Sequence, residues 1–291
     1  MNSFFQKKKK NEDRFYSQIR DFSERVANKK QIEYFWGNYK LYVQGNEKSF
    51  LSKAQKIGCF KQCWWEMVLT VGLLNVLNSK LEIHKKKKEE GPDILIHDPV
   101  EILPKIYIEA IAPKEGETEY KLPDLQWGCH KVPEKEFLFR LSGAFKEKYK
   151  KYGFYLDKNI LCENDIYIIA ISACNLSEYD SLMDSPRSAS LKFLFGVGNQ
   201  VVTPKESFVK YRPQVMKGNS PVEMNYFHKN EYNGISAVLY SNTGILRCPD
   251  KPDENFIIVK NPLAKNPLPS NLLKGVKSWI FDKKSKTLIK K

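Results

Sequence analysis

Residues 93–97 (DILIH) and 105–112 (KIYIEAIA) decide the fold. Both segments are rich in β-branched and aromatic side chains, which favour strands, and Pro113 ends the second segment. We therefore predict two neighbouring strands that pair as a hairpin, the second of them buried. This pairing would let the side chains of Asp93 and Glu109 point at one spot beyond the face of the sheet.

The two carboxylates differ in what they indicate. An aspartate at the start of a strand is by itself more often a turn or cap residue, and this is the alternative interpretation of Asp93. Glu109 lies inside an apolar strand, where an unpaired buried carboxylate is costly. Together the two side chains offer the hard oxygen ligands that Mg²⁺ takes.

The segments on either side of these strands predict helices. Residues 60–80 are apolar on most of the helix circumference and contain Glu66, so this helix must be buried on several sides. A second helix is predicted over residues 134–152, opened by Pro133 and closed by Gly153. Further strands are predicted at residues 165–173, which give the clearest buried pattern, and at 191–197, 235–241 and 256–260.

This order of elements predicts an α/β fold with a mixed central β-sheet flanked by helices. Residues 11–36 place apolar side chains every three to four positions, which predicts one or two amphipathic helices behind a loose tail over residues 1–10. We assign residues 1–58 to an N-terminal tail and helical extension, and residues 59–291 to the α/β domain. Residues 174–234 suggest no chemistry.

Composition and charge exclude several classes of protein. The chain has 291 residues, of which 42% are hydrophobic, so it is neither a disordered nor a low-complexity polymer. The net charge of +14 invites a polyanionic partner, but the excess lies in lysine clusters within residues 7–10, 85–88 and 283–291. The rest of the chain is nearly neutral. Lysine clusters are usually solvated tails or loops.

The apolar stretches and the cysteines bear on membrane association and on the cellular compartment. The most apolar stretch, residues 67–77, is far shorter than the roughly 20 residues that cross a bilayer, so no membrane partner is expected. The six cysteines show no paired spacing and follow no apolar leader, which predicts a cytoplasmic protein with free thiols.

Other site types lack the required spacing. Cys59, Cys63 and the Cys129-His130 pair do not have the paired spacing of a zinc ribbon or finger. The Gly196-Val197-Gly198 segment lacks the rest of a phosphate-binding loop and is interpreted as a turn at a strand end. The four histidines belong to no motif of a serine or cysteine enzyme.

The carboxylates belong to a recognisable pattern. Gly91-Pro92-Asp93 followed by Ile108-Glu109-Ala110 resembles the motif of the PD-(D/E)-x-K nuclease superfamily, which has the restriction-endonuclease-like fold. The chain is also similar to uncharacterised bacterial proteins that share four segments, namely WWEM (64–67), IEAIAP (108–113), RLSGAFKEKY (140–149) and NPLA-x-x-PLP (261–269). The resemblance implies that Asp93, Glu109 and the carbonyl of Ala110 bind Mg²⁺, or alternatively Mn²⁺.

The lysine of the superfamily motif is missing from its usual place. In the superfamily this lysine stands two residues after the glutamate, whereas this chain has Ile111 at that position. Some members of the superfamily carry the lysine on the neighbouring helix. On the helix predicted over 134–152, Lys148 lies about 60° from the centre of the apolar stripe and Lys146 about 100° from it. We therefore predict Lys148 as the catalytic lysine; the alternative is a lysine whose stem covers the core while its ammonium stays in water.

Three further residues have two interpretations each. Glu66 matches the helix glutamate that many superfamily members direct at the metal or the attacking water; the alternative is a structural, hydrogen-bonded glutamate. Arg140 is predicted to contact nucleic-acid phosphate, with a structural ion pair as its alternative. Lys146 is assigned to the same nucleic-acid surface.

The resemblance thus implies a Mg²⁺-dependent nuclease that hydrolyses phosphodiester bonds, with DNA favoured over RNA. Its rival is a catalytically degenerate module of the same fold that binds nucleic acid or protein, which Ile111 and the near-neutral body favour. An enzyme should place the Lys148 amine within about 4 Å of Asp93 or Glu109, whereas a binding module could leave it in solvent. The oligomeric state is left open.

Overall fold

The central feature is a mixed β-sheet. The computed structural model describes residues 3–22, 25–43, 45–77, 82–85, 91–98, 104–116, 121–122, 133–174, 176, 184–203, 206–282, 284–285 and 287–291. Within these residues, eight strands form one sheet in the order β1-β2-β3-β4-β9-β10-β11-β12. Neighbouring strands are parallel at β3-β4, β4-β9 and β10-β11, and antiparallel elsewhere. The predicted α/β class with a mixed sheet is confirmed.

The strands span β1 (Glu82–Lys85), β2 (Ile94–His97), β3 (Ile106–Ile111), β4 (Ile166–Ser172), β9 (Ala237–Ser241), β10 (Ile257–Lys260), β11 (Lys277–Asp282) and β12 (Thr287–Lys290). Two separate hairpins join β5 (Val197–Val202) to β6 (Ser207–Tyr211) and β7 (Gln214–Lys217) to β8 (Ser220–Glu223). The helices are α1 (Arg14–Asp21), α2 (Val26–Tyr39), α3 (Glu47–Gln55), α4 (Phe60–Val76), α5 (Glu134–Asp157) and α6 (Ala189–Phe195). Short 3-10 helices span Lys40–Tyr42, Tyr226–His228, Asn230–Tyr232, Ile245–Arg247 and Pro252–Asn255.

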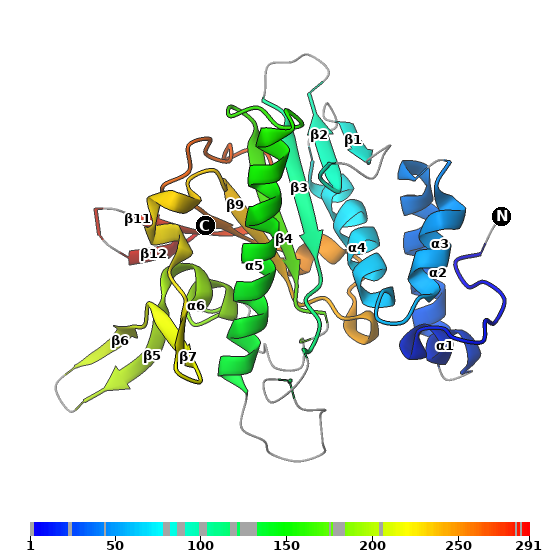
Figure 1. Ribbon diagram of the computed structural model, residues 1–291, viewed down its shortest axis with the longest axis horizontal. Coiled ribbons are helices and arrows are strands. Elements are labelled where there is room, and N and C mark those ends of the chain that lie inside the picture. The colour runs from blue at the N-terminus through cyan, green and yellow to red at the C-terminus, as the bar shows by residue number, and fades with distance from the viewer. Residues whose placement is uncertain are drawn as a thin grey trace.

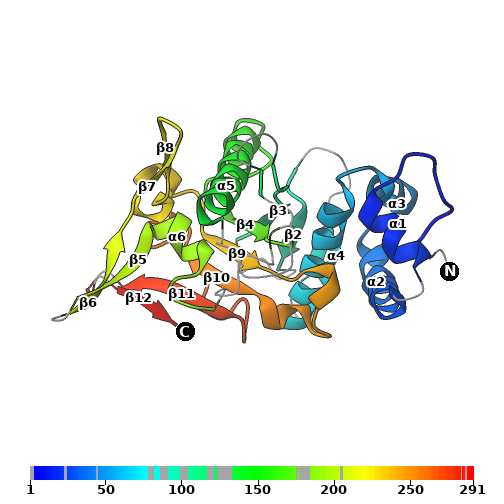
Figure 2. The ribbon, with the colours of Figure 1, turned by 90° about the horizontal axis from the view of Figure 1, so that it is seen from below.

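Helices cover both faces of the sheet, and each face has its own core. Along β3, Ile108 and Ala110 pack toward α4, whereas Tyr107 and Ile111 belong to the core on the α5 side. This alternation follows from the two-residue period of a strand. In Figures 1 and 2, α5 lies on one side of β3 and β4, and α1–α3 form an outer layer beyond α4.

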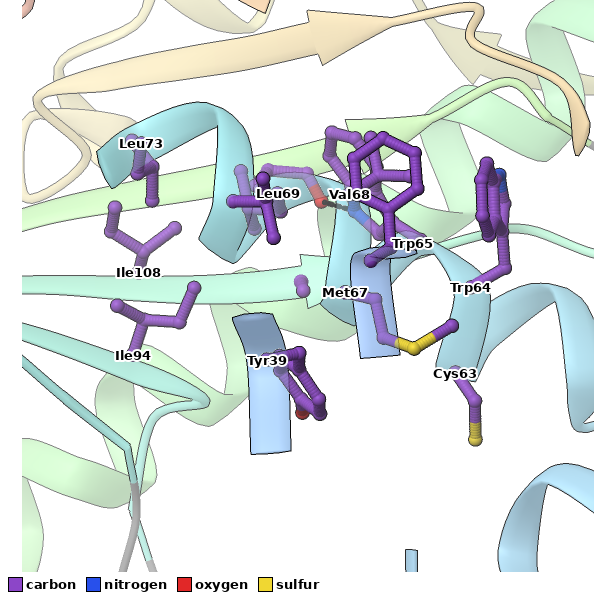
Figure 3. Packing of buried hydrophobic residues seen from close by; sticks show 14 of the residues in the cluster. Tyr39, Cys63, Trp64, Trp65, Met67, Val68, Leu69, Leu73, Ile94 and Ile108 are labelled. Atoms are coloured by element: carbon purple, nitrogen blue, oxygen red, sulfur yellow. Dashed lines mark hydrogen bonds between the residues drawn. The ribbon is translucent and has the colours of Figure 1, made fainter. Parts of the chain in front are cut away.

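Helix α4 is apolar on nearly all sides because it lies between the sheet and the N-terminal helices. Trp65 is fully buried, and its indole N–H donates to the carbonyl oxygen of Ala170 on β4 at 3.1 Å. Figure 3 shows the α4 side chains Leu69 and Leu73 packed near Ile108 of β3. Although α4 is this apolar, no helix among the described residues is long and apolar enough to cross a membrane.

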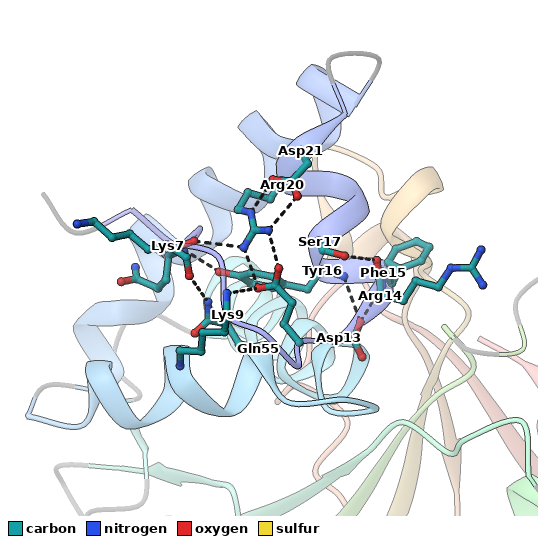
Figure 4. Close-up of polar contacts among 12 residues, drawn as sticks. Lys7, Lys9, Asp13, Arg14, Phe15, Tyr16, Ser17, Arg20, Asp21 and Gln55 are labelled. Atoms are coloured by element: carbon teal, nitrogen blue, oxygen red, sulfur yellow. Dashed lines mark hydrogen bonds and ion pairs between the residues drawn. The ribbon is translucent and has the colours of Figure 1, made fainter.

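The N-terminal segment is not the loose tail that the sequence predicts. Phe4 is fully buried, and its ring lies 5.7 Å from the ring of Tyr16 and 6.0 Å from that of Phe60. The Tyr16 hydroxyl donates to the Phe4 carbonyl and accepts from the Gln6 amide. Figure 4 shows further contacts, including the one between Gln55 and the backbone of Lys7. The lysines at positions 7–10 suggest a solvated tail, but burial of the aromatic ring just before them holds this segment against the N-terminal helices.

Two other predictions are corrected. Helix α5 does not end at Gly153 but continues to Asp157, because Tyr155 is buried and extends the packed face of the helix. Residues 191–197 are not a strand but belong mostly to helix α6, which Ser188 caps by accepting from the Leu191 amide. Gly196, with φ of +65°, ends that helix.

The stretch 174–234 contains the two separate hairpins. Gly198 in β5 lies so close to β6 that a Cβ atom there would be 2.1 Å from the carbonyl oxygen of Lys210. The Gly196-Val197-Gly198 segment is therefore a helix end that runs into a hairpin strand.

We expect Gly72→Ala in α4 to lower the free energy of unfolding by about 1–3 kcal/mol. A Cβ atom at this position would lie 2.5 Å from the ring of the buried Phe256, so the overlap requires the core to shift. The matched control is Gly153→Ala in α5, where a Cβ atom has no neighbour within 4 Å. Because alanine favours helices, the control should gain about 0.5–1 kcal/mol. Urea unfolding measures both, and equal effects would contradict the packing argument.

Candidate functional site

A cleft of about 830 Å³ opens at the end of β3. One wall comes from α3 and α4, the other from α5, and the floor from Asp93 and the segment that leaves β3. The charged side chains that line it are Lys53, Glu66, Asp93, Lys114, Glu115, Arg140, Glu147, Lys148, Lys151 and Lys217. Basic side chains therefore outnumber acidic ones in the lining of the cleft.

Strand pairing brings Asp93 and Glu109 together. Ile94 pairs with Ile108 in the antiparallel register of β2 and β3, which places Asp93 beside Glu109. The Asp93 amide donates to Glu109 Oε2 at 3.2 Å, and Asp93 Oδ2 accepts from the Ala110 amide at 2.8 Å. The Glu109 side chain is fully buried. The structure thus brings these two residues together, each carboxylate accepting from the backbone of the paired strand.

Three donors from α5 converge on the other oxygen of Glu109. Oε1 lies 2.6 Å from Lys151 Nζ, 3.4 Å from Lys148 Nζ and 3.2 Å from the Tyr155 hydroxyl. These residues follow one another at intervals of three and four, so they share one face of the helix. The Lys148 side chain is only 8% exposed, whereas that of Lys151 is 43% exposed.

Glu66 and Gln62 continue the polar site onto α4. Glu66 is 5% exposed, and its Oε1 lies 2.9 Å from Lys53 Nζ. Gln62 donates from Nε2 to the Ala110 carbonyl and to Glu66 at 3.3 Å each, and its Oε1 accepts from the Ala112 amide at 2.7 Å. Gln62 therefore links Glu66 to the backbone at the end of β3.

The carboxylates of the site have shifted pKa values. Burial and the neighbouring Asp93 raise the pKa of Glu109 above its usual range, and the ammonium groups of Lys148 and Lys151 offset this only in part. Burial also acts to raise the pKa of Asp93, but Lys148 and hydrogen bonds hold it below its usual range. Burial raises the pKa of Glu66 despite Lys53. Asp93 is therefore the more acidic member of the strand pair.

The two other predicted residues have different positions. Arg140 lines the cleft, where its guanidinium lies against Gly116, in the space that a Cβ atom of that glycine would fill. Lys146 is exposed on α5, with its ammonium 5.7 Å from the centre of the Tyr226 ring, and it is not among the residues that line the cleft. The structure therefore brings Arg140, but not Lys146, to the site.

The donor set suits a hard cation. Among the described residues, no three histidine, cysteine, aspartate or glutamate side chains come together as a metal cluster. Asp93 and Glu109 with the Ala110 carbonyl are all oxygen donors, and Mg²⁺ is commonly held by one or two carboxylates and several waters. Cys63 is buried and Cys59 half-buried, both as free thiols, while Cys129 and His130 lie outside the described residues.

Four residues of the site escape sequence analysis: Lys53, Gln62, Lys151 and Tyr155. Tyr155 lies beyond the predicted end of α5, and Lys151 lies further from the apolar stripe than Lys148. The repeat of Lys148, Lys151 and Tyr155 along one helix face is the signal that could have found them.

Comparison with known proteins identifies no relative. No protein-family model, no curated protein and no solved structure matches the chain. The chemistry of the cleft must therefore be inferred from its own geometry.

Proposed function

We propose that this protein is a Mg²⁺-dependent nuclease that hydrolyses phosphodiester bonds, with DNA as the favoured substrate. One observation carries the proposal: Asp93, which lines the cleft, contacts the buried Glu109, and the enclosed Lys148 amine lies 3.4 Å from the same Glu109 carboxylate. The resemblance to the PD-(D/E)-x-K nuclease superfamily supports it, since the residues that carry this resemblance lie together here.

Asp93, Glu109 and the Ala110 carbonyl would hold the ion. When bound, Mg²⁺ supplies a Lewis acid for the phosphate and lowers the pKa of water. Lys148 would orient the attacking water and stabilise the negative charge that develops on the phosphate. The water oxygen forms a bond to phosphorus, the bond from phosphorus to one sugar oxygen breaks, and that oxygen takes up a proton.

The rest of the cleft supports a polyanionic substrate. Lys53, Lys114, Arg140 and Lys217 line it from the sides, where basic groups can contact phosphates on either side of the bond that is cut. Glu66 and Gln62 would act indirectly, by holding the backbone at the end of β3.

The second candidate is a catalytically degenerate module that binds nucleic acid or protein. Ile111, which takes the usual place of the lysine, favours this candidate. The enclosed position of the Lys148 amine beside Glu109 favours the enzyme, because the superfamily resemblance implies a lysine amine next to the metal-binding carboxylates.

Calorimetric titration with Mg²⁺ or Mn²⁺ tests the proposal, together with cleavage assays on single- and double-stranded DNA and RNA. We expect the wild-type protein to bind the ion and to cut nucleic acid, and the double variant Asp93→Ala/Glu109→Ala to lose both properties. The matched control is Asp157→Ala, which removes an exposed carboxylate at the end of α5 and should change neither. A wild-type protein that binds no ion and cuts nothing would favour the degenerate module.

A further inference from the structure

The two lysines at Glu109 differ in what surrounds them. Lys148 is enclosed, and its amine lies at 3.4 Å from Glu109 Oε1. Lys151 is nearly half exposed, yet its amine makes the shorter contact, at 2.6 Å to the same oxygen. A half-exposed lysine has room to turn into the cleft, whereas Lys148 is fixed by its packing.

The site is neutralised by its own lysines. Three carboxylates, those of Glu66, Asp93 and Glu109, are balanced by the ammonium groups of Lys53, Lys148 and Lys151, which contact them or act on them at short range. A divalent cation that binds Asp93 and Glu109 must therefore compete with ammonium groups. Of the two ammonium groups that contact Glu109, that of Lys151 can leave at the lower cost, because it can be solvated or can pair with another anion.

We propose that Lys151 is an exchangeable counter-ion: it neutralises Glu109 in the free protein and moves to a substrate phosphate when the divalent cation binds. This inference rests on the proposed function, and it adds that metal ion and nucleic acid bind cooperatively. The cation releases the Lys151 ammonium, which then has a phosphate as its partner. A bound phosphate in turn holds the ammonium away from Glu109, so each ligand favours the other to the same extent.

The first test compares cation affinity between two lysine variants by calorimetry. In Lys151→Met the competing ammonium is gone, and we expect Mg²⁺ or Mn²⁺ to bind about three- to fivefold more tightly than to the wild-type protein. The matched control is Lys150→Met, which removes the same charge from the next, exposed position of α5 and should stay near wild type. Lys151→Arg, which keeps the charge, should also stay near wild type.

The outcomes separate this inference from the proposed function. If the wild-type protein binds the ion but Lys151→Met binds it no more tightly than Lys150→Met, the exchange is wrong and the nuclease proposal stands. If no form of the protein binds the ion, both are wrong.

The second test measures the coupling directly, by fluorescence anisotropy of a labelled DNA duplex in a Lys148→Met background, where cleavage should be slow. With Lys151 present, we expect Mg²⁺ to tighten duplex binding by at least about fivefold. Lys148→Met/Lys151→Met should lose most of this gain, whereas Lys148→Met/Lys150→Met should keep it. An equal gain in both double variants would overturn the proposal.

Discussion

Replacement of Lys148 by methionine is expected to lower the rate of phosphodiester cleavage about 100- to 10,000-fold, the range that a positioned proton-transfer group contributes. The Lys148 side chain is only 8% exposed, so solvent cannot take the place of its amine at Glu109. Lys151, which the proposed exchange assigns to a substrate phosphate, does not replace it either. Methionine keeps the length and apolar stem of the side chain, and Glu109 retains its contacts with Lys151 and Tyr155. The measurement is the single-turnover rate on a labelled duplex at saturating Mg²⁺.

The control is Lys150→Met, an exposed lysine of the same helix, which should cut at the wild-type rate. Cation binding by calorimetry should survive in Lys148→Met, because both carboxylates remain. A rate close to that of the wild-type protein would show that the chemistry does not use this amine.

Glu109→Ala is expected to lower the free energy of unfolding by about 3–5 kcal/mol, the usual cost of removing one partner of a buried ion pair. The glutamate is fully buried and accepts from two ammonium groups, a hydroxyl and a backbone amide, so its loss leaves Lys148 enclosed without this partner. Urea unfolding of the metal-free protein measures the effect.

A second variant identifies the cause. Glu109→Leu/Lys148→Met replaces both members of the pair by apolar side chains of similar size and should recover most of the lost stability. Asp157→Ala, at an exposed position of α5, should stay within about 0.5 kcal/mol of the wild-type protein. If the double variant is less stable than Glu109→Ala, the loss does not come from an unpaired ammonium.

The parts of the fold that sequence predicts well are those with one dominant pattern. β3, apart from Glu109, and β4 are runs of β-branched and apolar residues, and they form the parallel centre of the sheet. The end of α5 is missed because the local preference of Gly153 is weaker than the burial of Tyr155. Helix α6 is missed because a short apolar run fits a strand as well as a helix, and its end signals, Ser188 and Gly196, decide between them.

The residues of the candidate site also fall into those that the sequence can predict and those that it cannot. Asp93 and Glu109 could be placed together because they stand opposite each other in a hairpin, which is a local relationship. Lys148 could be found because helical periodicity turns it toward the core. Lys53 and Gln62 could not be found, because they reach the site only through the packing of α3 and α4 beside the sheet. The sequence pattern of each helix does not predict how the helices pack against one another.

The burial of Phe4 affects how susceptible the N-terminal segment is to proteolysis. The lysines at positions 7–10 present exposed side chains to trypsin, but the backbone around them is held by Tyr16 and Gln55. A protease needs several residues of released chain, so cleavage at these lysines must wait until the N-terminal layer detaches locally. The rate of that first cut therefore reports how often α1 and its preceding segment open, independently of the unfolding of the sheet.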